Sequence, residues 1–308
     1  MKKATRQAYG ETLLKLKDNK DLIVLDADLS AATKTDVFAK EVPNKFYNIG
    51  IAEADMMGTA AGLALGGKRP FASTFAIFGA GRAYEQIRNA IAYQNLNVTI
   101  AATHAGVTVG EDGGSHQAIE DIALMRVIPG MTIINPVDDL ETEAAMEAIM
   151  QHEGPVYLRL GRLAVNRVHK EKQPFVIGKG EELLAGHHGT IIATGAMVQE
   201  ALTAATLLQQ ENIFLNVINM PTIKPLDEAL LLKIAKKTPW IITAEEHSII
   251  GGLGSAVAEY LSEAYPIKLK KIGVEDRFGQ SGNPEILKEH YGLTASAIIE
   301  QAKNMSIR

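Results

Sequence analysis

Short runs of apolar and β-branched residues alternate with amphipathic segments along the first half of the chain. The runs that the pattern predicts as strands cover residues 21–26, 97–103, 131–136 and 155–160. The segments predicted as helices cover residues 4–17, 53–65, 82–94 and 138–151. Strands that alternate with helices at this spacing are typical of a parallel, doubly wound α/β sheet.

The alternation is interrupted once and then resumes. Residues 165–182 are charged and contain one proline and two glycines without a long apolar period, which is typical of a linker. Strands are predicted again at 189–195, 213–219, 240–246 and 267–274, with helices at 197–209, 226–237, 252–264 and 293–304. We therefore predict an α/β domain over residues 1–165, a linker over 166–185, and a smaller α/β domain over 186–308.

Composition narrows the class of protein. The chain has 308 residues, 46% of them hydrophobic, and a net charge of −5 without any Lys/Arg run, so we expect no nucleic-acid partner. It contains no cysteine, which excludes disulfides, thiol catalysis and cysteine-bound metals. With no signal peptide pattern and no apolar stretch of membrane-spanning length, we expect a soluble, cytoplasmic protein without a membrane partner.

Polar residues follow several predicted strands at the point where each strand ends. Asp26 and Asp28 follow the first strand, His104 follows the run 97–103, and Arg162 follows the run 155–160. Ligands of open parallel sheets lie beyond the carboxyl ends of the strands. The pattern therefore predicts a binding site at that edge.

A single carboxylate, Glu53, begins an otherwise apolar helical segment. Gly58, Gly62 and Gly66 follow at a spacing of four, which places them on one helical face. Such a face permits close helix packing, either inside this chain or where two chains meet. Glu53 either pairs with the helix dipole or meets a partner that requires a carboxylate.

The glycine-rich segment 103–121 contains His104, Asp112 and His116. Their spacing matches no common zinc pattern, so we predict no metal ligands in it. The segment is either a solvated surface loop or a loop whose backbone approaches a ligand closely.

Phe75 and Phe78 lie three residues apart, a spacing at which two side chains of a helix face the same way. Such a pair is either part of a core or the wall that stacks on a flat ligand ring.

The segment 245–260 contains Gly252 and Gly254, but Val257 stands where a dinucleotide-binding fingerprint requires glycine or alanine. We therefore interpret this segment as the N-terminus of a helix and predict no NAD site.

Four stretches together resemble the C-terminal half of transketolase: GIAEADMMGTAAGLAL (50–65), STFAIFGAGRAYEQIR (73–88), ATHAGVTVGEDGGSHQAIEDIALMR (102–126) and LRLGR (158–162). The resemblance spans nearly the whole chain, and the GEDGGSHQ run is its most specific part. It implies a pyrimidine-binding domain followed by a smaller C-terminal domain, as in thiamine-diphosphate enzymes. Nothing in the chain matches the G-D-G…N magnesium motif of the diphosphate-binding domain.

The resemblance also implies roles for residues that bind the cofactor. Glu53 matches the glutamate that hydrogen-bonds the N1′ nitrogen of the aminopyrimidine and promotes the tautomer from which the reactive carbanion forms. Phe75 and Phe78 match the aromatic pocket around the pyrimidine, and Asp28 matches a carboxylate near the thiamine. A tyrosine of the family falls near Gly81.

Further matches concern the substrate. His104 and His116 match catalytic histidines that line the substrate channel, and Asp112 matches a carboxylate that contacts the 2-hydroxyl of the acceptor sugar. Arg6 and Arg162 match the pair that holds the sugar phosphate. A serine of the family that helps to hold this phosphate is replaced by alanine at position 32, with Ser30 and Thr33 nearby.

The function implied is the transfer of a two-carbon ketol unit from a ketose phosphate to an aldose phosphate, as in the pentose phosphate pathway. An N-terminal partner subunit would supply the diphosphate-binding domain and bind Mg²⁺ or Ca²⁺, in a heterotetramer with two copies of each chain. The alternatives are a deoxyxylulose phosphate synthase, a 2-oxoacid dehydrogenase beta subunit, and a non-catalytic paralogue. The sequence leaves open which sugars are preferred.

Overall fold

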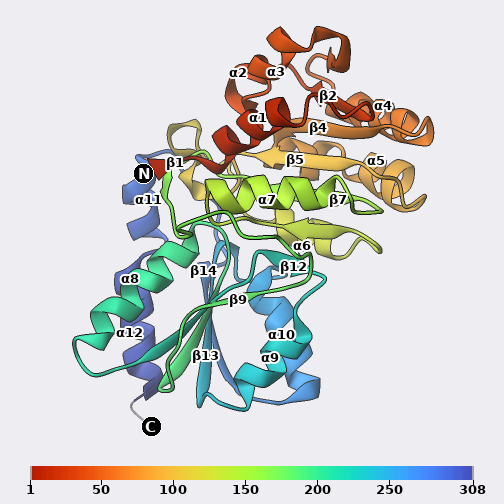
Figure 1. Cartoon of the computed structure of the whole chain (residues 1–308). Helices are drawn as coiled ribbons and strands as arrows, with labels where there is room; N and C mark the ends of the chain where they lie inside the picture. Colours follow the sequence, from red (N-terminus) through yellow and green to blue (C-terminus); the bar gives the residue numbers. More distant parts are fainter. Residues whose placement is uncertain (1, 307–308) are drawn as a thin grey trace.

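The computed structural model describes residues 2–306, which form two α/β domains that follow one another along the chain (Figure 1). Each domain is built around one mainly parallel sheet with helices on both faces. This architecture confirms the fold class predicted from the alternating pattern.

The sheet of the first domain has seven strands in the order β12-β6-β7-β5-β4-β2-β3. Their bounds are β2 (Leu22–Asp26), β3 (Phe46–Asn48), β4 (Arg69–Phe75), β5 (Thr99–Thr103), β6 (Thr132–Ile134), β7 (Val156–Arg159) and β12 (Thr222–Lys224). All neighbours run parallel except β12, which pairs antiparallel with β6. Because β12 comes from the second half of the chain, the second domain completes the sheet of the first.

Helices cover both faces of this sheet. Packed on one face are α1 (Thr5–Lys15) and α7 (Asp139–Ile149), and on the other α4 (Glu53–Leu65), the π-helix Ile87–Ala92 and α6 (Asp121–Arg126). Shorter elements are α2 (Ser30–Thr33), α3 (Asp36–Glu41), the 3₁₀ turn Pro43–Lys45, the π-helix Phe78–Arg82, α5 (Tyr84–Gln86) and the 3₁₀ segment Val107–Asp112. The central strands β2 and β5 are buried on both faces, which explains their continuous apolar runs.

The second sheet has the order β14-β13-β10-β11-β9. Its strands are β9 (Glu181–Leu184), β10 (Gly189–Ala193), β11 (Leu215–Asn219), β13 (Trp240–Ser248) and β14 (Lys268–Val274), with β9 antiparallel to β11. One face is covered by α8 (Met197–Gln209) and α12 (Ala295–Ser306), the other by α9 (Glu228–Ala235) and α10 (Leu253–Ala264) (Figure 1). The short helix α11 (Pro284–His290) packs against the 3₁₀ segment of the first domain.

The stretch predicted as a linker carries two short strands. β8 (Val165–Asn166) pairs antiparallel with β1 (Lys2–Lys3), and β9 adds the edge strand of the second sheet. Strands this short are too brief to show a sequence period. They form because they pair with a strand that is distant in the sequence.

The two domains share an apolar core, and a buried ion pair of the first domain reaches the backbone of the second. One apolar cluster runs from Met56 and Ile100 in the first domain to Ile241 and Val257 in the second. Arg159 at the end of β7 donates to the Asp121 carboxylate from Nε at 2.8 Å and to the backbone oxygen of Glu246 in β13 at 2.9 Å. The contact between the domains is therefore a packed interior.

The glycine face of α4 does not pack against any other part of the chain that the structure describes. Gly58, Gly62 and Gly66 are exposed, and a Cβ placed at Gly58 or Gly62 would meet no atom within 4 Å. The internal packing considered for this face is therefore wrong, and its use between chains remains a hypothesis.

Candidate active site

The parallel strands of the first domain bring chemically different residues to one edge of its sheet. Neighbouring strands β2, β4, β5 and β7 all run in the same direction, so their carboxyl ends lie together. Asp28 follows β2, Phe75 ends β4, His104 follows β5 and Arg162 follows β7. The arrangement is the one that parallel α/β sheets use for ligand sites.

Glu53 is buried at the start of α4, with 4% of its side chain exposed. Its position in the first turn places the carboxylate near the positive end of the helix dipole. Arg82 Nη1 lies 3.3 Å from Oε1 and 3.4 Å from Oε2, so the carboxylate has an ionic partner. Sequence reasoning did not find Arg82, because its pairing with Glu53 depends on how a π-helix packs against α4.

Four rings form a cluster that Arg82 connects to this carboxylate, since the Arg82 guanidinium also lies 4.2 Å from the centroid of the Phe78 ring. Phe75 and Phe78 are stacked with centroids 5.8 Å apart, and the His104 ring stacks on Phe75 at 3.8 Å. His116 meets Phe78 edge-on at 5.4 Å. The two phenylalanines do not share a helix, since Phe75 ends β4 and Phe78 begins the π-helix. The cluster thus links the loops after β4 and β5.

His104 is buried and held in one tautomer. Arg6 Nη1 lies 3.3 Å from its Nε2, and Thr103 Oγ1 lies 2.9 Å from its Nδ1. Since a guanidinium only donates, Nε2 accepts and Nδ1 carries the proton. Burial, together with the charges of Arg6, Arg162 and Lys34, lowers the pKa of His104 to about 3. The imidazole is therefore neutral at physiological pH.

Three cations surround this imidazole. Arg6 donates to the backbone oxygen of Ala32 at 2.6 Å, so the position that lacks the family's serine still contacts this arginine. Arg162 donates to the backbone oxygen of Val109 and lies 3.6 Å from Asp112. Lys34, which sequence reasoning missed, acts on His104 electrostatically. The combined charge suits an anionic ligand.

Asp28 is the predicted site residue that stands apart. Its carboxylate accepts a hydrogen bond from Asn48 Nδ2 at 2.8 Å, and its backbone has a left-handed φ of 64°. Within residues 2–306 its hydrogen bonds run to Asn48 and not to the ring cluster. It lies at the same sheet edge without joining the four rings.

The loop that carries Asp112 and His116 is supported by the second domain. Gln117 donates to the backbone oxygens of Val107 at 3.0 Å and Gln280 at 2.9 Å, and Ser281 donates to that of Glu111 at 2.6 Å. A Cβ at Gly114 would lie 2.6 Å from the oxygen of Gly279, so only glycine permits this approach. The second domain therefore shapes the candidate site without entering it.

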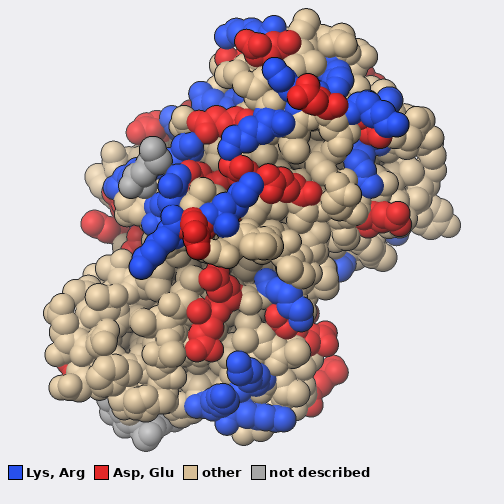
Figure 2. Space-filling model, in the orientation of Figure 1, with Lys and Arg blue, Asp and Glu red and all other residues tan. Residues whose placement is uncertain are grey.

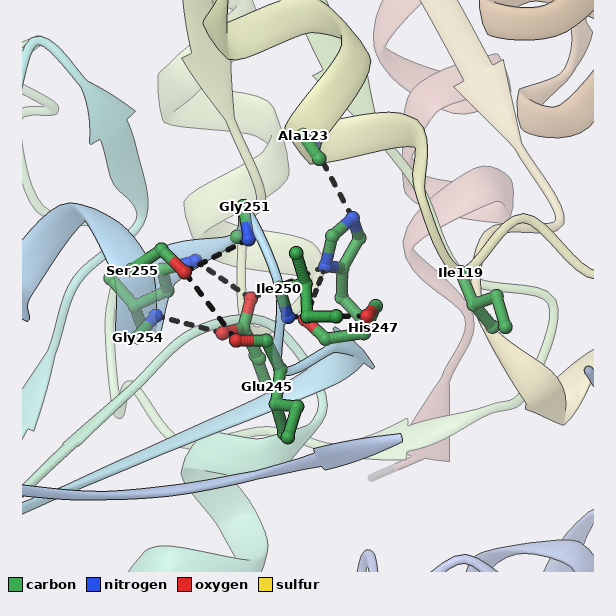
Figure 3. Close-up of polar contacts among 12 residues, drawn as sticks. Ile119, Ala123, Glu245, His247, Ile250, Gly251, Gly254 and Ser255 are labelled. Carbon is green, nitrogen blue, oxygen red and sulfur yellow. Dashed lines mark hydrogen bonds and ion pairs between the residues drawn. The ribbon is translucent and has the colours of Figure 1, made fainter. Parts of the chain in front are cut away.

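The segment 245–260 forms the N-terminus of α10, as predicted. The buried Glu245 carboxylate accepts from the backbone N–H groups of Leu253 at 2.7 Å and Gly254 at 2.8 Å (Figure 3). A carboxylate of the chain itself thus occupies the place where a helix N-terminus would bind a phosphate. In the same network His247 accepts from the backbone N–H of Ala123 at 3.3 Å, which connects β13 to α6.

Acidic and basic side chains are interspersed over the first domain on the face shown in Figure 2.

In the part of the chain that the structure describes, no group of three His, Asp or Glu residues could hold a metal ion. Among those same residues, no helix combines the length and apolar character needed to cross a membrane.

Comparisons with known proteins agree with this architecture. The family model described as transketolase, pyrimidine binding domain, matches residues 1–167, and that of the transketolase C-terminal domain matches residues 178–298. A chain of Methanocaldococcus jannaschii named "Putative transketolase C-terminal section" is 49% identical over 97% of this chain and 95% of its own length. A 6-deoxy-6-sulfo-D-fructose transketolase subunit from Clostridium sp. is 44% identical over 98% of this chain and 94% of its own length.

Among solved structures, one described as a split gene transketolase, inactive beta4 tetramer, is 52% identical to this chain. It superposes with a TM-score of 0.92 and covers 98% of both chains.

The fold and these matches define a protein composed of a pyrimidine-binding domain and a transketolase C-terminal domain. The chain belongs to the transketolase family, and it is similar over nearly its whole length to the C-terminal part of split transketolases. The family uses thiamine diphosphate.

Proposed function

We propose that this chain is the C-terminal subunit of a thiamine-diphosphate-dependent transketolase, which transfers a two-carbon ketol unit from a ketose phosphate to an aldose phosphate. The observation that carries the proposal is the buried carboxylate of Glu53, which Arg82 links to the stacked rings of Phe78 and Phe75. In this proposal the pyrimidine-binding domain ends near residue 165 and the C-terminal domain begins near residue 186.

The residues around Glu53 fit an aminopyrimidine. The Glu53 carboxyl group is 4% exposed and therefore poorly hydrated. Because it has little hydration to lose, a hydrogen bond in which it shares a proton with a ring nitrogen is favourable. Phe78 is half-buried and offers a ring face to a flat heterocycle. Thiamine diphosphate, when bound, supplies the nucleophilic carbon on which ketol transfer depends.

The opposite side of the ring cluster suits the sugar. His104 has a protonated Nδ1 held by Thr103, and its Nε2 is an acceptor that can take a hydrogen bond from a substrate hydroxyl in place of Arg6. His116 and Asp112 belong to the loop that follows His104, where they would contact the carbonyl and hydroxyl oxygens of the sugar. Arg6, Arg162 and Lys34 would hold the anionic end.

The relatives are named for substrates that differ in the sugar and in its anionic group. The Clostridium relative is named for a sulfonated sugar, 6-deoxy-6-sulfo-D-fructose. Three cations around His104 favour a phosphate dianion over a sulfonate monoanion, because the Coulomb attraction increases with ligand charge. We therefore propose sugar phosphates as substrates.

A partner chain completes the proposed enzyme. The two domains of this chain match the pyrimidine-binding and C-terminal parts of the family, so the diphosphate and its Mg²⁺ or Ca²⁺ would be bound by an N-terminal subunit. We propose a cytoplasmic heterotetramer with two copies of each chain, and an isolated chain without activity. The similar beta4 tetramer described as inactive supports that expectation.

Reconstitution with the N-terminal subunit tests the function. The complex is expected to convert xylulose 5-phosphate and ribose 5-phosphate and not to consume pyruvate, which separates it from the deoxyxylulose phosphate synthase and oxoacid dehydrogenase alternatives. Glu53→Gln is expected to lower kcat by about 10²–10⁴-fold, since it removes a positioned proton-transfer group. Asp55→Asn on the exposed side of the same helix is the matched control. A Glu53→Gln complex with unchanged kcat would contradict the mechanism and favour a non-catalytic role for this residue.

A further inference from the structure

Arg82 contacts both groups that the proposed cofactor needs, the Glu53 carboxylate and the Phe78 ring. Its Nη1 lies 3.3 and 3.4 Å from the two carboxylate oxygens of Glu53, and its guanidinium lies 4.2 Å from the centroid of the Phe78 ring. It is the last residue of the π-helix that Phe78 begins. One side chain therefore pairs with the acid and covers the ring face at the same time.

This arrangement is incompatible with a pyrimidine in the same place. The Arg82 guanidinium lies against both carboxylate oxygens of Glu53, which are the atoms that a ring nitrogen of the pyrimidine would have to approach. The stacked guanidinium also lies over the Phe78 face on which a heterocycle would pack. The cofactor and the Arg82 side chain therefore compete for one position.

The contacts of Arg82 suit a side chain that can leave. Its side chain is 55% exposed, and both distances to the carboxylate are long for a charged hydrogen bond. Glu53, by contrast, is 4% exposed, and a buried carboxylate without a partner is costly. Arg82 is thus the counter-ion of the Glu53 carboxylate. If the Arg82 side chain moves away, water can solvate its guanidinium.

We propose that Arg82 is a displaceable counter-ion of Glu53: it neutralises the carboxylate and covers Phe78 in the cofactor-free subunit, and it swings into solvent when the pyrimidine binds. The inference rests on the proposed function, because it assigns this site to thiamine diphosphate. Arg82 is then a positioning residue that acts through Glu53 and that opposes cofactor binding.

Calorimetric titration of the reconstituted complex with thiamine diphosphate and Mg²⁺ tests the competition directly. Removing the competitor in Arg82→Gln is expected to lower Kd by roughly two- to fivefold, the range of a partly exposed ion pair. Arg82→Lys keeps the charge but loses the planar stack, so its Kd is expected to lie between those of the wild type and Arg82→Gln. Arg88→Gln is the matched control, since Arg88 is exposed on the following segment and bonds Asn89. An unchanged or raised Kd in Arg82→Gln would overturn the proposal.

A second measurement separates displacement from a merely structural role. Arg82→Gln is expected to lower the Tm of the cofactor-free complex and to leave that of the saturated complex unchanged, because the wild-type pair is already broken there. In a Glu53→Gln background, Arg82→Gln is expected to change Kd by less than it does in the wild type, because only the cover over Phe78 is then removed. An equal loss of Tm with and without cofactor would mean that Arg82 only stabilises the fold.

The outcomes also distinguish this inference from the proposed function. If the wild-type complex does not bind thiamine diphosphate, both fail. If the wild type binds the cofactor and performs ketol transfer while Arg82→Gln binds it no more tightly, only the role of Arg82 is wrong.

Discussion

At the scale of single residues, His104 shows how surroundings decide what a side chain can do. Its ring is 3% exposed, stacks on Phe75 and accepts from Arg6. Burial and neighbouring cations both disfavour a second proton on the imidazole. A histidine usually titrates near neutral pH, whereas this one is fixed as a neutral acceptor.

His104 is accordingly expected to remain neutral from pH 8 to pH 5, since its pKa is lowered to about 3. Because the folded-state pKa lies below the ordinary value of about 6.5, its contribution to stability is fully present above pH 6.5 and is lost as pH falls toward 3. Histidine NMR of the folded chain measures the titration. In Arg6→Gln the pKa should rise but stay below 6.5, because burial is the largest cause. A wild-type midpoint between 6 and 7 would refute this environment.

Glu53 and Arg82 differ in how far sequence could reveal them. A lone carboxylate at the front of an apolar helix is visible as a contrast in composition, and Glu53 was identified in that way. Arg82 is one of many surface-compatible arginines in the sequence. Its pairing with Glu53 depends on the π-helix Phe78–Arg82, whose geometry no sequence period indicates.

At the scale of elements, α4 combines a functional N-terminus with an exposed glycine face. Glycines in a helix interior lower its stability, and no contact within residues 2–306 requires them at positions 58 and 62. Exposed Ile51 and Leu65 lie at either end of the same helix, with 77% and 65% of their surface accessible. We interpret this face as a contact between chains, which the isolated fold does not need.

This interpretation predicts that substitutions on the glycine face can stabilise the isolated chain and that a larger side chain weakens its association with a partner subunit. Gly58→Ala combined with Gly62→Ala is expected to raise the free energy of unfolding of the isolated chain by about 1–2 kcal/mol, because alanine is the better helix former and meets no atom. Gly62→Leu is expected to leave the chain folded but to weaken its association with a partner subunit. Urea unfolding and analytical ultracentrifugation measure the two effects. Normal assembly of Gly62→Leu would exclude this face from the interface.

At the scale of the whole molecule, the two domains behave as one packed body. Strand β12 of the second half completes the first sheet, and Lys224 at its end donates to the backbone oxygens of Arg126 and Ile128. Burial acts to raise the pKa of Asp121, but Arg159 outweighs it and holds this pKa below the usual range. The pair joins β7, α6 and β13 at the centre of the junction.

Breaking that pair should destabilise both domains together. Arg159→Met is expected to lower the free energy of unfolding by about 3–5 kcal/mol, because it leaves a buried carboxylate without its cation. Arg159→Met combined with Asp121→Leu should recover much of this loss. Glu259→Gln, which breaks a pair between Arg126 and a 64% exposed carboxylate, should cost less than about 1 kcal/mol. Urea unfolding followed by circular dichroism measures all three. Equal losses for Arg159→Met and Glu259→Gln would contradict the argument.

The sequence by itself determined the alternation of strands and helices in two α/β units and the start of α4 at Glu53, because each of these depends on periodicity and end signals within a short window. It also indicated the chemistry at the strand ends. It did not indicate β3 or β4, and the single helix predicted over residues 82–94 is instead α5 followed by a π-helix. Only the tertiary structure decided that β12 crosses into the first sheet, that Arg82 covers Glu53 and Phe78, and that residues 279–281 support the loop with Asp112. These contacts join residues up to 170 positions apart. They are selected by mutual burial and charge pairing, which exist only once the chain has packed.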